Sequence, residues 1–72
     1  MLRLNKDDKV TVVYEGEEIE GKVIRITKAG NFKVRHEGFY FRLPEEHTFY
    51  PNGLVYGSKK HKWNVMHIEK AI

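Results

Sequence analysis

The chain has 72 residues, no cysteine and a formal net charge of +3. A domain of this size buries only about 60% of the surface of its unfolded chain, which leaves little room for an enclosed active site. The lack of cysteine excludes a disulfide framework and a thiolate zinc site, and it suits a reducing cytoplasm. No apolar run is long enough to span a bilayer and no signal-peptide pattern opens the chain, so we expect one cytoplasmic domain over residues 1–72 with no membrane contact.

The positive charge is concentrated in the middle of the chain. Residues 23–43 carry five basic side chains and one acidic side chain, whereas residues 1–22 carry four basic and six acidic side chains. Such an asymmetry can mark a face that binds a polyanion, and in so short a chain it can equally arise by chance.

Turn residues recur about every eight to twelve residues, with β-branched and aromatic residues between them, which is typical of a small all-β barrel or sandwich. The first strand is predicted at residues 9–14, "KVTVVY", and Glu15-Gly16 ends it. The second strand is predicted at about residues 19–27. The next turn is Lys28-Ala29-Gly30, a three-residue loop whose last position requires the left-handed backbone that Gly30 adopts without steric cost.

This loop length places the apolar side chains on one face of the hairpin. The predicted pairs are Ile26 with Phe32, Ile24 with Val34, and Arg25 with Lys33. A tight turn at Glu37-Gly38 then predicts the pairs Val34 with Phe41, Phe32 with Leu43, and His36 with Phe39. On this register we expect five side chains to be buried: Ile24, Ile26, Phe32, Val34 and Phe41. Pro44 is expected to end the strand, because it cannot donate a hydrogen bond to a neighbouring strand.

Two further elements follow. Asn52-Gly53 is a strong hairpin signal, and it predicts a hairpin between "TFY" and "LVYG" around Pro51-Asn52-Gly53. The tail is ambiguous, because Val65, Ile68 and Ile72 have helical spacing while Met66 and Ile68 alternate as in a strand. We prefer a strand over residues 63–69, since a barrel needs its edge covered.

The stretch "DKVTVVYEGEEIEGKVIRITKAGNFKV" resembles the KOW-type segment of small Src-homology-like barrels, a group that includes Tudor-type domains. The matching residues are Gly16, Gly21, Val23, Ile24, Ile26 and Val34. The resemblance implies a five-stranded barrel that binds RNA, DNA, or ribosomal and polymerase proteins. One difference is the loop "EGEEIEG", which is usually basic in members that bind nucleic acid. The later stretch "HTFYPNGLVYG" and the end "HIEKAI" are similar in character to short phage-type proteins.

The outer face of the three central strands is the first candidate site. One predicted row holds Arg25, Lys33 and Arg42, and the next holds Arg35 and Tyr40. Basic groups beside an aromatic ring suit a phosphate backbone and a stacked base. The alternative is a solvated sheet face. The predicted pairing places Lys33 directly opposite Arg42, which costs stability, and a bound polyanion would offset that cost.

Two other surfaces are candidates for a protein partner. The acidic loop, with Glu17 and Glu18, could bind a basic partner or a hard cation, could be a solvated turn, or could keep a barrel edge from pairing. Its glutamates lack the ligand spacing of a calcium loop. Tyr50, Tyr56 and Trp63, with Phe49, could line an aromatic groove for proline-rich or methylated peptides, or they could belong to the core.

The four histidines, His36, His47, His61 and His67, lack the short spacing of a zinc enzyme, so we predict neither a metal site nor a cofactor. His36 is expected to pack at one end of the barrel beside Phe39. No nucleophile-and-base pair or phosphate-cradling glycine loop is recognisable, so we predict no enzyme. The sequence therefore predicts a five- to six-stranded antiparallel barrel of the Src homology 3-like type that binds nucleic acid, with a protein-interaction module as the alternative.

Overall fold

A computed structural model describes residues 2–38, 44–56 and 66–71. Its strands are β1 (Lys9–Tyr14), β2 (Glu17–Ile26), β3 (Phe32–Glu37), β4 (Pro44–Phe49) and β5 (Met66–Lys70). They form one sheet in the order β4-β3-β2-β1-β5, and every neighbouring pair is antiparallel. The described part of the chain is therefore all-β, as predicted. None of the described segments forms a helix that could cross a membrane.

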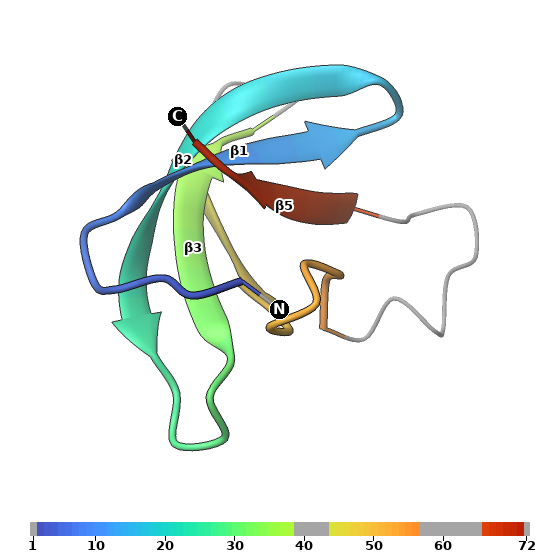
Figure 1. Cartoon of the computed structure of the whole chain (residues 1–72). Helices are drawn as coiled ribbons and strands as arrows, with labels where there is room; N and C mark the ends of the chain where they lie inside the picture. The colour runs from blue at the N-terminus through green and yellow to red at the C-terminus, as the bar shows by residue number, and fades with distance from the viewer. Residues whose placement is uncertain (1, 39–43, 57–65, 72) are drawn as a thin grey trace.

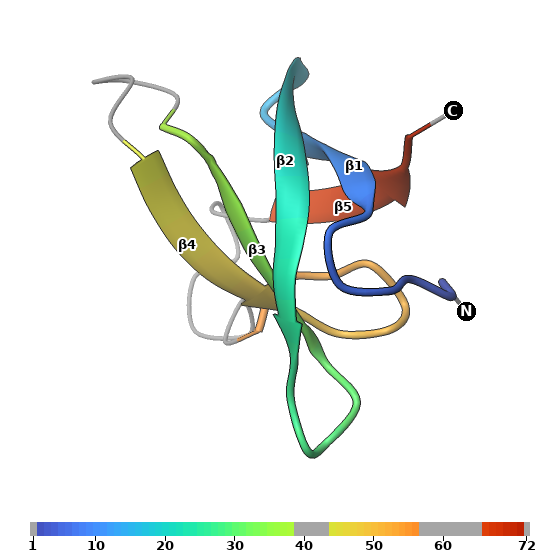
Figure 2. The same ribbon diagram turned by 90° about the vertical axis from the view of Figure 1, so that its left-hand side faces the viewer.

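The sheet curls into an open half-barrel, with β4 and β5 at its two edges (Figure 1, Figure 2). The segment after β4 crosses between these edges. Phe49 forms an isolated bridge with Val55, and Leu54 forms one with His67 of β5. The amide of Val55 also donates to the carbonyl of Met66 at 3.0 Å. The segment thus links both edges of the sheet at one end of the half-barrel.

The concave face of the sheet carries the core. Alternate residues of each strand point inward, as expected for a strand with one buried face. The buried apolar residues are Leu4, Val10, Val12, Val23, Phe32, Val34, Phe49, Val55, Met66 and Ile68. The N-terminal segment closes one end, because Leu4 is buried and the amide of Leu2 donates to the carbonyl of Pro51 at 2.8 Å.

The hairpin between β2 and β3 confirms the predicted three-residue loop. The amide of Thr27 donates to the carbonyl of Asn31 at 2.9 Å, and Gly30 has a φ of +84°. Two of the predicted pairs are also correct: Ile26 with Phe32, and Arg25 with Lys33.

The predicted pair of Ile24 with Val34 is wrong. A bulge lies between Val23 and Arg25, so that Val23 pairs with Val34. A bulge places two residues opposite one and bends the strand. Val23 is therefore fully buried, Ile24 is only half-buried, and Ile26, predicted to be buried, is 42% exposed. Phe32 and Val34 are buried as predicted, and Phe41 lies outside the described residues.

The predicted partner of β3 is also wrong. The strand that pairs with β3 is β4, not residues 39–43. Phe32 therefore pairs with Phe49, Val34 with His47, and His36 with Glu45, in place of Leu43, Phe41 and Phe39. This register packs the fully buried ring of Phe49 against Phe32. Pro44 begins a strand rather than ending one, which is tolerated because β4 is an edge strand.

The remaining elements agree with the predictions. Tyr50 and Leu54 flank the turn at Pro51-Asn52-Gly53, and the amide of Tyr50 donates to the carbonyl of Leu54 at 2.8 Å. The C-terminal segment is a strand as predicted: β5 spans Met66–Lys70, and residues 63–65 of the predicted range lie outside the described residues. Met66 and Ile68 both point into the core, as their alternation predicts.

Gly21 lies on the inner face of the curled sheet, in close approach to two valines. A Cβ atom at this position would meet the Cγ1 atom of Val34 at 2.9 Å and the Cγ2 atom of Val12 at 3.0 Å. A glycine inside a strand often marks such a close approach. The absence of a side chain at Gly21 therefore lets β1 and β3 bring their valines together behind β2.

Candidate functional site

The convex face of the sheet carries two adjacent rows of basic side chains. Lys22 of β2 pairs with Lys9 of β1 on one side and with Arg35 of β3 on the other. The next row holds Arg25 and Lys33, which are also paired. Paired residues on neighbouring strands point to the same face. The strand pairing therefore brings five cations together, and we call Lys9, Lys22, Arg25, Lys33 and Arg35 the basic face.

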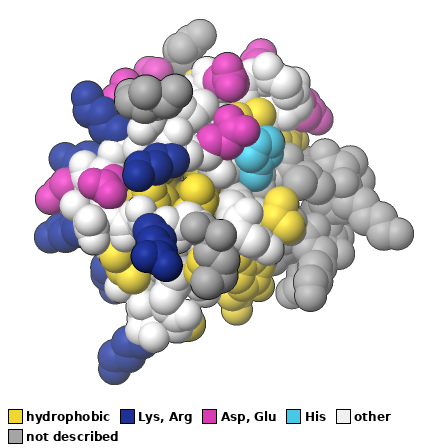
Figure 3. Space-filling model, in the orientation of Figure 1, with side chains coloured by type: hydrophobic (Ala, Val, Ile, Leu, Met, Phe, Trp, Pro, Cys, Tyr) yellow, Lys and Arg dark blue, Asp and Glu magenta, His cyan; other side chains and the backbone are white. Residues whose placement is uncertain are grey.

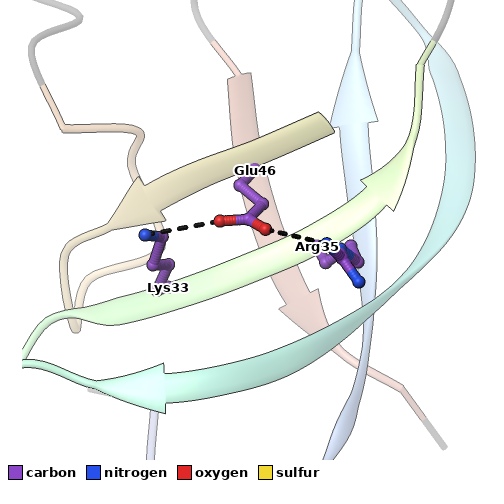
Figure 4. Close-up of polar contacts among 3 residues, drawn as sticks. All are labelled: Lys33, Arg35 and Glu46. Carbon is purple, nitrogen blue, oxygen red and sulfur yellow. Dashed lines mark ion pairs between the residues drawn. The ribbon is translucent and has the colours of Figure 1, made fainter. Parts of the chain in front are cut away.

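Glu46 of β4 interrupts the edge of this face (Figure 4). Its carboxylate lies 3.3 Å from the ammonium of Lys33 and 3.2 Å from the guanidinium of Arg35. Glu46 pairs with Arg35 across the strands, and Thr48 pairs with Lys33. The predicted repulsion between Lys33 and Arg42 therefore does not follow, because the residue opposite Lys33 is a threonine and the nearest charge is a carboxylate.

Two more ion pairs involve the basic face. Lys9 lies 3.4 Å from Glu20, and Lys22 lies 3.6 Å from Asp7. These side chains are all more than half exposed, so each pair contributes between about 0 and 1 kcal/mol. Arg25 forms no ion pair within the described part of the chain. The five cations thus outnumber the three carboxylates paired with them. Three further carboxylates alternate onto the same convex face, so the convex face as a whole is mixed in charge: Glu18, Glu37 and Glu69.

The space-filling view shows this distribution directly. Lys and Arg side chains gather along the left margin, on the side of the molecule where β2 and β3 lie in Figure 1 (Figure 3). Some Asp and Glu side chains lie between them, and others lie along the top of the view. The surface is therefore a mixed one, with cations gathered at the left margin.

The structure brings together three of the five residues predicted to bind nucleic acid, namely Arg25, Lys33 and Arg35. The other two, Tyr40 and Arg42, lie outside the described residues. Sequence reasoning missed Lys9 and Lys22. The signal was present, since a two-residue turn at Glu15-Gly16 pairs Lys9 with Lys22 when the register is followed to the end of the strand.

Of the two surfaces predicted for a protein partner, the acidic turn adjoins the basic face, because Glu18 lines a shallow hollow together with Lys9. Glu15 and Gly16 both have positive φ, at 50° and 80°, and form the tight turn between β1 and β2, next to exposed Glu17 and Glu18. The rings of Tyr50 and Tyr56 lie 5.2 Å apart between centroids, and Tyr56 is 61% exposed. Trp63 lies outside the described residues. Phe49, offered for the same groove, is fully buried in the core.

A cluster of two histidines lies on the inner face, where β3 meets β4. The Nε2 atom of His36 lies 2.8 Å from the Nδ1 atom of His47, and the rings stack with centroids 5.0 Å apart. Glu45 pairs with His36 across the strands and points to the same face. Burial lowers the pKa of His47, the neighbouring His36 lowers it further, and the carboxylate of Glu45 acts in the opposite direction.

The prediction that His36 packs inside the barrel is confirmed, since it is only 3% exposed. Its predicted neighbour Phe39 lies outside the described residues. The expectation of no metal site rests on the spacing of the histidines in the sequence. That spacing could not reveal the contact between His36 and His47, because the contact depends on the pairing of β3 with β4.

Comparison of the chain with protein-family models, with curated proteins and with solved structures gives no match. The function must therefore be argued from the geometry of the described surfaces.

Proposed function

We propose that the protein is a non-enzymatic binding module that contacts the phosphate backbone of nucleic acid through the basic face. We also propose that its half-barrel belongs to the Src-homology-like barrels of the KOW type. The observation that supports the binding proposal is the row formed by Lys9, Lys22 and Arg35 on three neighbouring strands, with Arg25 and Lys33 beside it. Neighbouring strands lie about 4.8 Å apart, so these cations are close enough to act on one polyanion.

The ion pairs of this face do not prevent binding. A phosphate can replace a carboxylate beside an exposed lysine or arginine at little cost, because an exposed pair is worth at most about 1 kcal/mol. Lys9, Lys22 and Arg35 line a shallow open groove together with Glu20 and Glu37. Because carboxylates lie in the groove, we expect a nucleic acid to contact the groove through its phosphate backbone and not to insert its bases deeply. We therefore expect binding that depends on the backbone and discriminates little between sequences.

Salt dependence tests this proposal. If each of the five cations contacts one phosphate, the slope of log affinity against log salt concentration should be about −3.5 for single strands and about −4.5 for duplex DNA. Fluorescence anisotropy with a labelled single strand and a labelled duplex, at a series of salt concentrations, measures both slopes. A protein that binds neither probe at low salt contradicts the proposal.

Charge reversal at Arg25 provides the matched test. Arg25→Glu should weaken binding and flatten the slope by about one unit, because one phosphate contact is lost. Arg3→Glu is the control, since it makes the same change of net charge in the N-terminal segment. Arg3 is exposed, and the amide of the neighbouring Leu2 donates to the carbonyl of Pro51 instead of to a strand of the basic face. Equal effects of the two variants would show that net charge, and not this face, drives binding.

The exposed tyrosines favour a second candidate, a module that binds proline-rich peptides. Tyr56 and Leu54 are 61% and 42% exposed, and Tyr50 stacks obliquely against Tyr56. Aromatic surfaces of this kind hold extended proline-rich segments. A proline-rich peptide should then shift the amide signals of residues 50–56, and Tyr56→Ala should abolish the shift. A peptide that shifts none of these signals excludes this candidate.

A further inference from the structure

We propose that His36, His47 and Glu45 form a binding site for a divalent transition-metal ion of the zinc class. The site lies on the inner face at the edge of the sheet, where β3 pairs with β4. This inference does not rest on nucleic-acid binding, because the three residues point to the face of the sheet opposite to the basic face.

The ligand atoms of the three residues are already close together. One nitrogen of each histidine and one carboxylate oxygen of Glu45 all lie within 4.8 Å of one another. His36 is buried, His47 is half-buried and Glu45 is exposed, so the cluster runs from the core to the surface. An ion could therefore reach the site from solvent, and the exposed side would keep a position for water.

A backbone hydrogen bond prepares His36 to act as a ligand. Its Nδ1 atom lies 2.9 Å from the carbonyl oxygen of Glu37. A carbonyl oxygen can only accept, so Nδ1 carries the proton and donates it to this bond. The lone pair of Nε2 is then directed toward His47. Histidine ligands of metal ions characteristically donate their second ring nitrogen to a carbonyl or carboxylate in this way.

The bond between the two rings marks the place of the ion. With Nε2 of His36 as acceptor, Nδ1 of His47 is the donor at 2.8 Å. Two nitrogen ligands at about 2.05 Å from a tetrahedral zinc ion lie about 3.3 Å apart. The rings must therefore separate by about half an ångström, and His47 must carry its proton on Nε2 instead. The shared proton of the unliganded pair is replaced by the metal ion.

The chemistry of the three donors defines the class of metal. Imidazole nitrogens select zinc, copper, nickel and iron over magnesium and calcium, which prefer oxygen ligands. Two histidines and one carboxylate form a recurrent zinc-binding set that leaves a fourth position open. Bound here, the ion would tie the edge strand β4 to β3, and above its dissociation constant it should stabilise the folded chain by an amount that rises with the logarithm of its concentration.

Titration of the wild-type protein with zinc chloride, followed by the imidazole signals in proton–carbon NMR spectra, tests the proposal without a mutation. We expect saturation at one ion per chain, with the ring signals of His36 and His47 shifted and those of His67 unchanged. His67 is the internal control, since it lies on β5 beside Glu69, at 3.7 Å, and forms a histidine–carboxylate pair outside the cluster. Magnesium chloride should shift none of the ring signals.

Variants give the second test, by calorimetric titration with zinc. Loss of a residue that only hydrogen-bonds to a metal ligand lowers metal affinity about 10–100-fold. His47→Gln removes a ligand itself, so it should lower the affinity for zinc by at least that factor. Glu45→Gln should weaken binding by a smaller factor and keep the fold, because Glu45 is exposed. His67→Gln should bind as the wild type does. Absence of stoichiometric binding to the wild type, unchanged binding by the folded Glu45→Gln and His47→Gln variants, or ring shifts confined to other histidines would overturn the proposal.

Discussion

Replacing Glu46 with glutamine should strengthen nucleic-acid binding, because it releases two cations of the basic face. The carboxylate of Glu46 lies within 3.3 Å of Lys33 and 3.2 Å of Arg35, and its side chain is only 34% exposed. Each ion pair is worth up to about 1 kcal/mol, and a phosphate that contacts both cations has to displace the carboxylate. After a discount for screening by solvent, we expect a gain of about 1–1.4 kcal/mol, which is about five- to tenfold in affinity.

Fluorescence anisotropy at low salt measures the change in affinity, and the gain should shrink as salt is raised, because screening weakens both the ion pairs and the phosphate contacts. Glu18→Gln is the matched control. It makes the same change of net charge in the exposed hairpin between β1 and β2, away from these cations. If folded Glu46→Gln binds no more tightly than Glu18→Gln, the carboxylate does not compete with phosphate, and the reasoning is refuted.

Three predictions concern the fold, and urea unfolding followed by circular dichroism measures each of them. Gly21→Ala should lower the free energy of unfolding by about 1–3 kcal/mol, because the new methyl group would overlap Val34 and Val12; an unchanged midpoint would contradict the close approach at this point. Gly30→Val should cost at least about 1–2 kcal/mol, because φ is +84° there although the space around it is open; a neutral effect would disprove the left-handed loop. Phe49→Ala should cost about 3–5 kcal/mol and largely unfold the chain, since the ring is fully buried; a variant of native stability would contradict the pairing of β4 with β3.

The first three strands were predictable because their apolar side chains alternate with polar ones and their turns contain glycine. The alternation in residues 9–14 and the left-handed requirement at Gly30 fix the first strand and the second hairpin. The bulge between Val23 and Arg25 was not predictable. Val23 and Ile24 are both β-branched and apolar, so the pattern does not show which of them faces Val34. Only the packing of the whole core decides between them.

Only the end of the fourth strand, within "TFY", was predicted, and the rest was missed because two of the three inward residues of β4 are polar. Residues 39–43 offer a phenylalanine, a second phenylalanine and a leucine at alternate positions, whereas β4 places Glu45 and His47 beside Phe49. An apolar alternation therefore favours the wrong partner for β3. Places where such rules fail tend to be functional or strained. Glu45 and His47, the polar residues that break the apolar alternation of β4, are also two of the three ligands of the proposed metal site.

The candidate sites were predictable to different degrees. Arg25 and Lys33 could be placed together from the hairpin alone, since the loop length sets their pairing. The role of Glu46 could not, because it depends on the register between β3 and β4. The contact between His36 and His47 has the same origin. The role of Glu46 and the histidine contact thus both depend on the pairing of β3 with β4. Lys9 and Lys22 were missed for another reason, because the pairing of β1 with β2 was not followed to the end of the strand.

The most direct test of the proposed function is an amide-shift titration of the wild-type protein with a single-stranded oligonucleotide at low salt. The account predicts that the largest shifts fall on the basic face, at the amides of Lys9, Lys22, Arg25, Lys33 and Arg35, and that they disappear at high salt. Shifts confined to residues 50–56, or no shifts at any ratio of oligonucleotide to protein, would contradict it.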